Sequence, residues 1–260
     1  MPESLSFDRA ADFYDQTRSL LEPIARQGTE AILDLTGHSA RILDVGTGTG
    51  RISVPLLERG ADLVGCDISS KMLSRLREKF PSARILQSDA SRLPFPNDRF
   101  DAVLTVHVMH LIAPWRAALR EFQRVLSHGG IYLNVRTYAS VGESLREQVR
   151  TYWRGWVEAQ GGHIHQPGIR DHEEFLQELR SLGTNLTERE VVRFTLPFTL
   201  REELDRFASR IYSDTWDIPD DIFDASLEEL RVWVERQFGD LDQQRQDEVR
   251  FVIDAARFDG

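Results

Sequence analysis

The sequence predicts an α/β fold with a Rossmann-like, doubly wound sheet. Over residues 41–136, short apolar runs alternate with helical patterns, and the connections between them are short. Buried parallel strands are apolar along their whole length, and the helices between them cover both faces of the sheet. At 260 residues and 41% hydrophobic composition, the chain is long enough to bury such a core. No apolar run approaches the roughly 18 residues of a membrane span.

The first half of the chain supplies most of the expected sheet. Apolar residues at three- and four-residue spacing predict helices over 52–59, 71–80 and 117–126, and we expect Gly129-Gly130 to end the last of them. The expected strands between these helices are RILDVG, DLVGCDI, ARILQSD, FDAVLTVHV and IYLNV. Strand–helix alternation of this kind is typical of a doubly wound sheet.

The second half of the chain is mostly helical. Aromatic and apolar residues share one face of a long helix predicted over 143–160. Ser226, three residues before Glu229, predicts the N-cap of a later helix. The remaining expected elements are helices over 171–181, 201–212 and 226–238 and strands over 191–197 and 248–257.

This order of elements predicts a core with two helical insertions. Insertions late in a doubly wound fold lie over the carboxyl ends of the strands, where ligands bind, so we interpret them as a cap over the site. The expected parts are an N-terminal helix and cofactor-binding core over 1–137, a first cap insertion over 138–170, a core helix and strand over 171–199, a second cap insertion over 200–245, and a last core strand over 246–260.

Charge and cysteine content narrow the class of protein. The net charge is -10, and twelve Asp and Glu against three Arg lie between Asp214 and Glu248. No cluster of Lys and Arg is present to bind a phosphate backbone, which argues against a nucleic-acid partner. The single cysteine, Cys66, excludes an internal disulfide and a cysteine-based zinc site. The acidic N-terminal stretch has no apolar signal region, so we expect a cytoplasmic protein.

A glycine-rich loop is the strongest local motif. The segment DVGTGTGR at 44–51 follows a predicted strand and opens a helix, so its glycines allow a tight turn and close approach to a ligand. The glycines at 46, 48 and 50 are spaced G-x-G-x-G, whereas a dinucleotide fingerprint needs G-x-G-x-x-G. The loop also has no Walker lysine to hold a phosphate.

Acidic residues stand near the ends of three successive strands. Asp44 precedes the glycine loop, Asp67 ends the next strand, and Asp89 follows the one after. A carboxylate at the position of Asp67 is placed to accept hydrogen bonds from both hydroxyl groups of a ribose. Asp89 is placed to accept a hydrogen bond from the exocyclic amine of an adenine. These acids therefore indicate a ligand with a cationic amine, a ribose and an adenine.

The segments ILDVGTGTGR, VGCDISSKML, LQSDASRLPFPNDRFD and HLIAPWRAALREFQRVLSHGG resemble the class I S-adenosylmethionine-dependent methyltransferases. The type 11 branch, which includes the ubiquinone and menaquinone C-methyltransferases, is the most similar. The resemblance covers about residues 7–136 and departs from the family only at His128, where a proline is usual. It implies a seven-stranded sheet with an antiparallel last strand, S-adenosylmethionine as cofactor and S-adenosylhomocysteine as product.

The resemblance also implies roles for individual residues, carried over by position. Val106 and His107 are expected near the sulfonium, and Tyr14 and Arg18 are expected to close over the cofactor from an N-terminal helix. The other implied cofactor contacts are Asp44, Gly46, Thr47, Gly48 and Gly50 at the methionine end, Asp67 on the ribose, Ile68 and Met72 flanking the adenine, and Asp89 and Ala90 at its edge.

The methyl acceptor is less determined by the sequence. The sulfur leaves as a neutral group in methyl transfer, so a base is needed only where the acceptor must lose a proton. His107 and His110 are the candidate bases, because both follow the fourth strand. Candidate substrate contacts in the cap are Trp153, Trp156, His163 and Tyr212. We predict no metal site, since His163 and His165 have no Asp, Glu or Cys at ligand spacing in their loop.

We therefore expect an S-adenosylmethionine-dependent methyltransferase that acts on an unidentified small molecule by in-line transfer under a helical cap. Two alternatives stay open at this point: a methyltransferase acting on tRNA or protein, and a catalytically silent protein that binds the cofactor. A nicotinamide oxidoreductase is disfavoured by the glycine spacing. The sequence does not indicate an oligomeric state.

Overall fold

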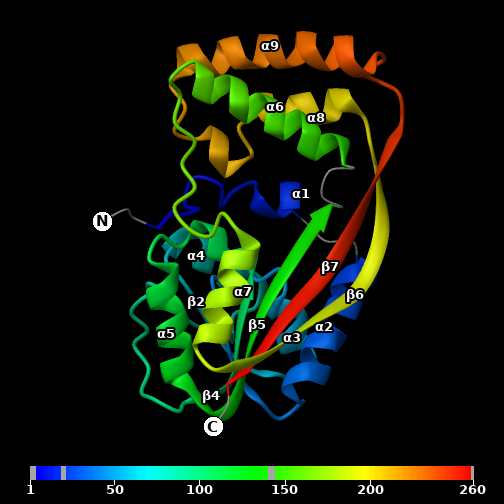
Figure 1. The fold of residues 1–260 in the computed structure, drawn as a ribbon. Coiled ribbons are helices and arrows are strands. Elements are labelled where there is room, and N and C mark those ends of the chain that lie inside the picture. The colour runs from blue at the N-terminus through cyan, green and yellow to red at the C-terminus, as the bar shows by residue number, and fades with distance from the viewer. Residues whose placement is uncertain (1–3, 19–21, 140–143, 259–260) are drawn as a thin grey trace. The chain divides into compact units, whose positions relative to one another are not determined.

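A mixed β-sheet forms the centre of the fold. The computed structural model describes residues 4–18, 22–139 and 144–258, without the side chains of Arg18, Tyr138 and Ala139. These residues form a seven-stranded sheet with the order β3-β2-β1-β4-β5-β7-β6 (Figure 1). The strands are β1 (Arg41–Val45), β2 (Asp62–Asp67), β3 (Arg84–Gln87), β4 (Phe100–Val106), β5 (Leu126–Ala139), β6 (Thr184–Phe198) and β7 (Arg245–Phe258).

The first five strands are parallel, as the apolar runs predict. β1 lies between β2 and β4, and Leu43 is in register with Val64 on one side and Val103 on the other. Leu43 and Val103 are buried, in keeping with strands covered on both faces. β7 runs antiparallel to its neighbours near the edge of the sheet (Figure 1). The expected α/β sheet with a reversed last strand is confirmed.

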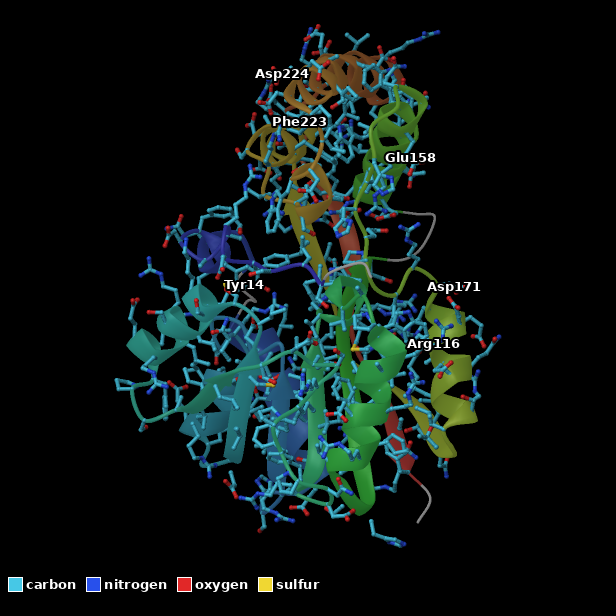
Figure 2. All side chains as sticks on the ribbon, turned by 90° about the vertical axis from the view of Figure 1, so that its left-hand side faces the viewer. Tyr14, Arg116, Glu158, Asp171, Phe223 and Asp224 are labelled. Atoms are coloured by element: carbon cyan, nitrogen blue, oxygen red, sulfur yellow. The ribbon has the colours of Figure 1, made fainter. Side chains whose placement is uncertain are left out.

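Helices connect and cover these strands (Figure 1). α5 and α7 lie side by side, and Arg116 of α5 pairs with Glu174 and Glu178 of α7 (Figure 2). α2 packs closely on β7, since a Cβ added to Gly28 would lie 2.6 Å from Cζ of Phe251. The helices of this part are α1 (Tyr14–Arg18), α2 (Glu22–Thr36), α3 (Ser53–Glu58), α4 (Ser70–Lys79), the 3-10 helix η1 (Met109–Leu111), α5 (Trp115–Val125) and α7 (His172–Ser181).

The chain divides into two compact units. Unit 1 comprises Met1–Arg136, Pro167–Val192 and Phe251–Gly260, and unit 2 comprises Thr137–Gln166 and Arg193–Arg250. Unit 2 contains α6 (Leu145–Ala159), α8 (Leu200–Ala208), η2 (Ser213–Thr215) and α9 (Asp220–Phe238). Each unit has a core of its own, and in unit 2 the ring of Trp153 packs against that of Phe207 at 5.2 Å.

Two local predictions are wrong. Ser226 is no N-cap, because α9 already begins at Asp220 and Ser226 is buried inside it. The glycine pair does not end α5, which stops at Val125, and both glycines belong to β5. The reason is a bulge: Phe100 is in register with Leu126, while Ala102 is in register with Ile131. Glycines fit the extra residues of such a bulge.

In the part of the chain that the structure describes, no helix has the length and apolar character needed to cross a membrane.

Candidate functional site

The glycine loop joins β1 to α3 at the carboxyl end of the parallel strands. The backbone N–H groups of Gly46 and Thr47 both donate to the carbonyl oxygen of Cys66 in β2, at 2.8 and 3.0 Å. Gly46, Gly48 and Gly50 have φ of +76°, +58° and +85°, a left-handed conformation that other residues adopt at a cost. The loop is therefore tied to the end of β2 and kept in a turn that needs glycine.

Two of these glycines are also required by packing. A Cβ on Gly46 would lie 2.5 Å from Cγ2 of Val108, and one on Gly50 would lie 2.3 Å from Cδ1 of Leu76. At Gly48, by contrast, the nearest atom to an added Cβ is Cε of Met72 at 3.4 Å. An added Cβ at Gly48 would make only an ordinary contact with Met72, so at this position the positive φ, and not packing, favours glycine.

Asp44 lies beneath this loop and is 1% exposed. The hydroxyl of Ser53 donates to its Oδ2, while Oδ1 has no hydrogen-bond partner among the described residues. Burial raises the pKa of Asp44 to about 6, although the hydroxyls of Ser53 and Thr47 act in the opposite direction. A buried carboxylate oxygen without a donor is costly, and a cationic amine would satisfy it.

Asp67 ends β2 on the other side of the loop. Its Oδ2 accepts from the N–H of Gly48 at 2.9 Å, and its Oδ1 accepts from the N–H of Ser69 at 2.8 Å. Burial raises the pKa of Asp67, and the two backbone donors only partly offset this. Its neighbour Ile68 is half-buried. The structure therefore brings Asp44 and Asp67 together around the predicted loop.

Asp89 follows β3, the next strand along this edge. Its Oδ1 accepts from the N–H and the hydroxyl of Ser91, both at 2.8 Å, and the side chain is exposed. Ala90 beside it is at the limit of burial. This is an ordinary turn, which leaves the other carboxylate oxygen available to a ligand, so the role of Asp89 stays a prediction.

Acidic side chains outside the predicted site attach the N-terminal segment to the same edge. Asp8 accepts from the hydroxyl of Ser69 at 2.5 Å. Asp15 accepts from the hydroxyl of Thr49 at 2.6 Å and pairs with Lys79 at 2.5 Å. The three- to four-residue spacing of the N-terminal aspartates, with Asp12 between these two, was the available signal.

The resemblance implies cofactor contacts for Tyr14 and Arg18, and the structure describes the side chain of the first only. Tyr14 lies on α1, half-buried, with its ring edge-on to Phe7 at 5.9 Å (Figure 2). The side chain of Arg18 lies outside the described residues. Closure of Tyr14 and Arg18 over a cofactor therefore stays a prediction.

A pocket of about 130 Å³ opens after β4 in unit 1. Val108, whose methyl groups pack on Gly46, is part of its wall, so the pocket adjoins the glycine loop. His107 has φ of +52°, a strained conformation for this residue type that is frequent at functional sites. The pocket is lined by His107, Val108, Met109, His110, Asn134, Val135, Arg136, Ile169, His172 and Phe175.

A chain of polar side chains leads from the core to this pocket. Thr105 contacts the hydroxyl of Tyr132 at 2.8 Å and donates to Asn134 at 3.2 Å. Asn134 then donates to Asp254 at 3.0 Å, and Arg136 holds both oxygens of Asp254 at 2.9 and 3.0 Å. No local sequence pattern indicates this network, because Asp254 is 120 residues away from Asn134 along the chain.

The candidate substrate residues all lie in unit 2. Trp153 is 1% exposed and donates to the hydroxyl of Ser226 at 2.8 Å, which is a core position. Tyr212 is also buried and donates to Glu203 at 2.7 Å. Trp156 is half-buried, and His163 is exposed. In this structure Trp156 and His163 thus have side-chain surface for a ligand, whereas Trp153 and Tyr212 serve the unit's own packing.

Fold and loop together define a Rossmann-like protein with a glycine turn at the carboxyl edge of its parallel strands. A family model described as a methyltransferase domain matches residues 43–134. An uncharacterized methyltransferase of Mycobacterium tuberculosis is 32% identical over 215 residues, which cover 82% of this chain and 79% of that protein. The chain therefore belongs to the methyltransferase family, and it is an S-adenosylmethionine-dependent methyltransferase.

Other relatives agree with this assignment. The demethylmenaquinone methyltransferase of Beutenbergia cavernae is 36% identical over 127 residues, 48% of this chain and 53% of that protein. The predicted resemblance to the quinone-pathway branch is thereby confirmed. A phosphoethanolamine N-methyltransferase of Haemonchus contortus, solved with S-adenosylhomocysteine, has a TM-score of 0.55 at 18% identity over 97% of this chain and 58% of that chain. This second likeness shows the fold alone.

Proposed function

We propose that the protein transfers the methyl group of S-adenosylmethionine to a small-molecule acceptor and forms S-adenosylhomocysteine. The observation that carries the proposal is the buried Oδ1 of Asp44, which has no hydrogen-bond donor among the described residues and lies beside the glycine loop. A cationic amino group is the partner that this oxygen needs. An adenosyl sulfonium amino acid carries such a group.

The residues around the loop fit the remaining parts of this cofactor. The half-buried carboxylate of Asp67 is held rigidly by two N–H groups and still has lone pairs for ribose hydroxyls. Met72 and Ile68 supply apolar surface for a base. The cofactor, when bound, supplies an activated methyl group. The protein has to hold the two reactants in line and keep water out.

We also propose that unit 2 acts as the helical cap of this site. Its first segment follows directly from β5, which continues past the residue where its parallel partner β4 ends. The insertion therefore leaves the sheet at the carboxyl edge, where ligands bind in doubly wound folds. Trp156 and His163 are its candidate acceptor contacts.

Calorimetric titration with S-adenosylhomocysteine tests the cofactor site. We expect binding by the wild type and a loss of about tenfold or more in affinity for Asp67→Ala, since a charge-assisted hydrogen bond is lost. Asp62→Ala is the matched control, because Asp62 lies at the opposite end of the same strand and pairs with Arg84. Absence of binding by the wild type, or equal affinities of the two variants, would refute the proposal.

A further inference from the structure

Resting on the proposed methyl transfer, we propose that His172, backed by Asp254, takes the proton from a hydroxyl group in the pocket after β4, and that the protein is therefore an O-methyltransferase of an alcohol or phenol.

His172 reaches this pocket from the start of a helix. It is the first residue of α7, directly after the N-cap Asp171, whose side chain accepts from the N–H of Glu173 (Figure 2). The pocket that His172 lines also contains Val108, which contacts the glycine loop at Gly46. An acceptor in this pocket therefore lies next to the loop assigned to the cofactor.

Asp254 is the carboxylate behind the imidazole. It is buried on β7, and Nε2 of His172 lies 3.6 Å from its Oδ2. This Nε2 is itself buried and has no hydrogen-bond partner among the described residues. A slight tightening would make Asp254 its acceptor, and catalytic contacts are often long without substrate. The proton would then sit on Nε2, which leaves Nδ1 as the basic nitrogen.

Charged side chains from three strands meet at Asp254, the carboxylate behind His172. Arg136 of β5 pairs with Asp254 of β7 and also with Glu188 of β6, at 2.6 Å, so one guanidinium faces two carboxylates. Burial disfavours the ionised Asp254, but His172 and Arg136 outweigh it and hold the pKa of its carboxyl at about 2. The guanidinium of Arg136 and the two carboxylates together carry a formal charge of -1. His107 and His110 face the same pocket from the segment after β4.

The exposed part of the His172 ring also allows the proton to pass on to solvent. The side chain of His172 is 38% exposed, although its Nε2 is buried. In the proposed step, a lone pair of the hydroxyl oxygen forms the bond to the methyl carbon and the electron pair of the carbon–sulfur bond goes to sulfur. The hydroxyl proton passes to His172. Water then removes that proton from the exposed side of the ring.

A base of this kind selects the chemical class of the acceptor. A neutral hydroxyl is a weak nucleophile and gains most from losing its proton as it attacks. A carboxylate or an aromatic thiol is largely ionised at neutral pH, and an aromatic amine attacks through its own lone pair. Met109, Ile169 and Phe175 are part of the pocket lining and give a carbon skeleton apolar surface to contact.

Four probes that differ only in the accepting group test this inference: phenol, thiophenol, aniline and benzoate, each with methyl-labelled S-adenosylmethionine at neutral pH. We expect the wild type to methylate phenol. His172→Gln should lower kcat for phenol about 100-fold, with KM changed less than about threefold, and should lower kcat for thiophenol less than about threefold. Asp254→Asn, the positioning variant, should lower kcat for phenol about tenfold with the same selectivity.

Calorimetry with S-adenosylhomocysteine shows which variants are folded and keeps the two proposals apart. His128→Gln is the matched control, because His128 is exposed at the opposite end of β5 and should leave every rate unchanged. The inference is overturned if a wild type that binds S-adenosylhomocysteine does not methylate phenol. It is also overturned if His172→Gln lowers the phenol and thiophenol rates equally, or if His110→Gln alone shows the selective loss. A wild type that fails to bind S-adenosylhomocysteine instead refutes the proposed function.

Discussion

A buried carboxylate under a glycine turn responds to pH differently from one in water. The folded protein holds the proton of Asp44 more tightly than the unfolded chain does, with pKa values of about 6 and 3.8. The stability associated with this proton is therefore present below about pH 4 and is lost as the pH rises through about 6, at a cost of roughly 3 kcal/mol. A ligand amine that pairs with ionised Asp44 would recover part of that cost.

The raised pKa of Asp44 leads to a prediction for cofactor binding. If the ionised form of Asp44 binds the amino group, affinity for S-adenosylhomocysteine should fall about tenfold from about pH 7 to about pH 5, on either side of the pKa near 6. Asp44→Asn should bind more weakly at neutral pH and show a flatter dependence over this range. Calorimetry across the pH series measures both. A wild-type affinity that stays constant or rises on acidification would contradict the assignment.

Single residues also show what sequence can and cannot reveal. The glycines and Asp44, Asp67 and Asp89 follow strand ends at recognisable spacing, so their common edge could be predicted. His172 and Asp254 belong to no recognisable sequence motif: one begins α7, and the other lies inside β7. Only the register of β7 beside β5 brings Asp254 to Asn134 and Arg136. Such long-range pairing has no local signal.

At the level of elements, one of the contacts that attach the N-terminal segment is an exposed ion pair. Asp15 pairs with Lys79, and both side chains are more than one third exposed. Exposed pairs contribute about 0–1 kcal/mol, so their loss should loosen the segment without unfolding the protein. The segment is therefore suited to local opening beside the glycine loop.

Asp15→Asn tests this attachment. We expect faster hydrogen exchange over residues 8–17, a nearly unchanged Tm, and affinity for S-adenosylhomocysteine weakened less than about fivefold. Asp34→Asn is the control, because Asp34 makes an exposed pair with Arg189 away from this segment. Exchange rates equal to those of the wild type would show that the segment is fastened by other contacts.

The elements themselves were largely predictable where one physical rule decides. Apolar runs gave the parallel strands, and spaced apolar residues gave α3, α4 and α5. Ser226 misled because a capping sequence also occurs inside α9, where the hydroxyl instead accepts from Trp153 and donates to the carbonyl of Phe223. The glycine pair misled because a bulge and a helix end both favour glycine.

For the molecule as a whole, the candidate cofactor residues and a buried ion-pair cluster lie in different units. In unit 2, Asp214 is 3% exposed and binds Arg150 and Arg154 of α6 at 3.1 and 2.9 Å. Burial alone would raise the pKa of Asp214, but the two guanidinium groups outweigh it and lower the pKa. All the candidate cofactor residues belong to unit 1.

Asp214→Asn should therefore destabilise the protein without a specific effect on the cofactor. Removing one partner of a buried ion pair costs about 3–5 kcal/mol, because the arginines stay behind uncompensated. We expect a lower Tm by calorimetry and unchanged affinity for S-adenosylhomocysteine at a temperature where the variant is folded. Asp217→Asn, an exposed change in the same segment, should alter neither. A folded Asp214→Asn that no longer binds would mean that the units are coupled.

The side chain of Val108 packs against Gly46 and also lines the pocket after β4. Its methyls fill the space that a side chain at position 46 would need, and they also form part of the pocket wall. A larger residue at 108 would clash with the glycine turn. A smaller one would leave a cavity beside Gly46 and enlarge the pocket. A substitution of Val108 that changes the acceptor specificity should therefore also change the affinity for the methyl donor.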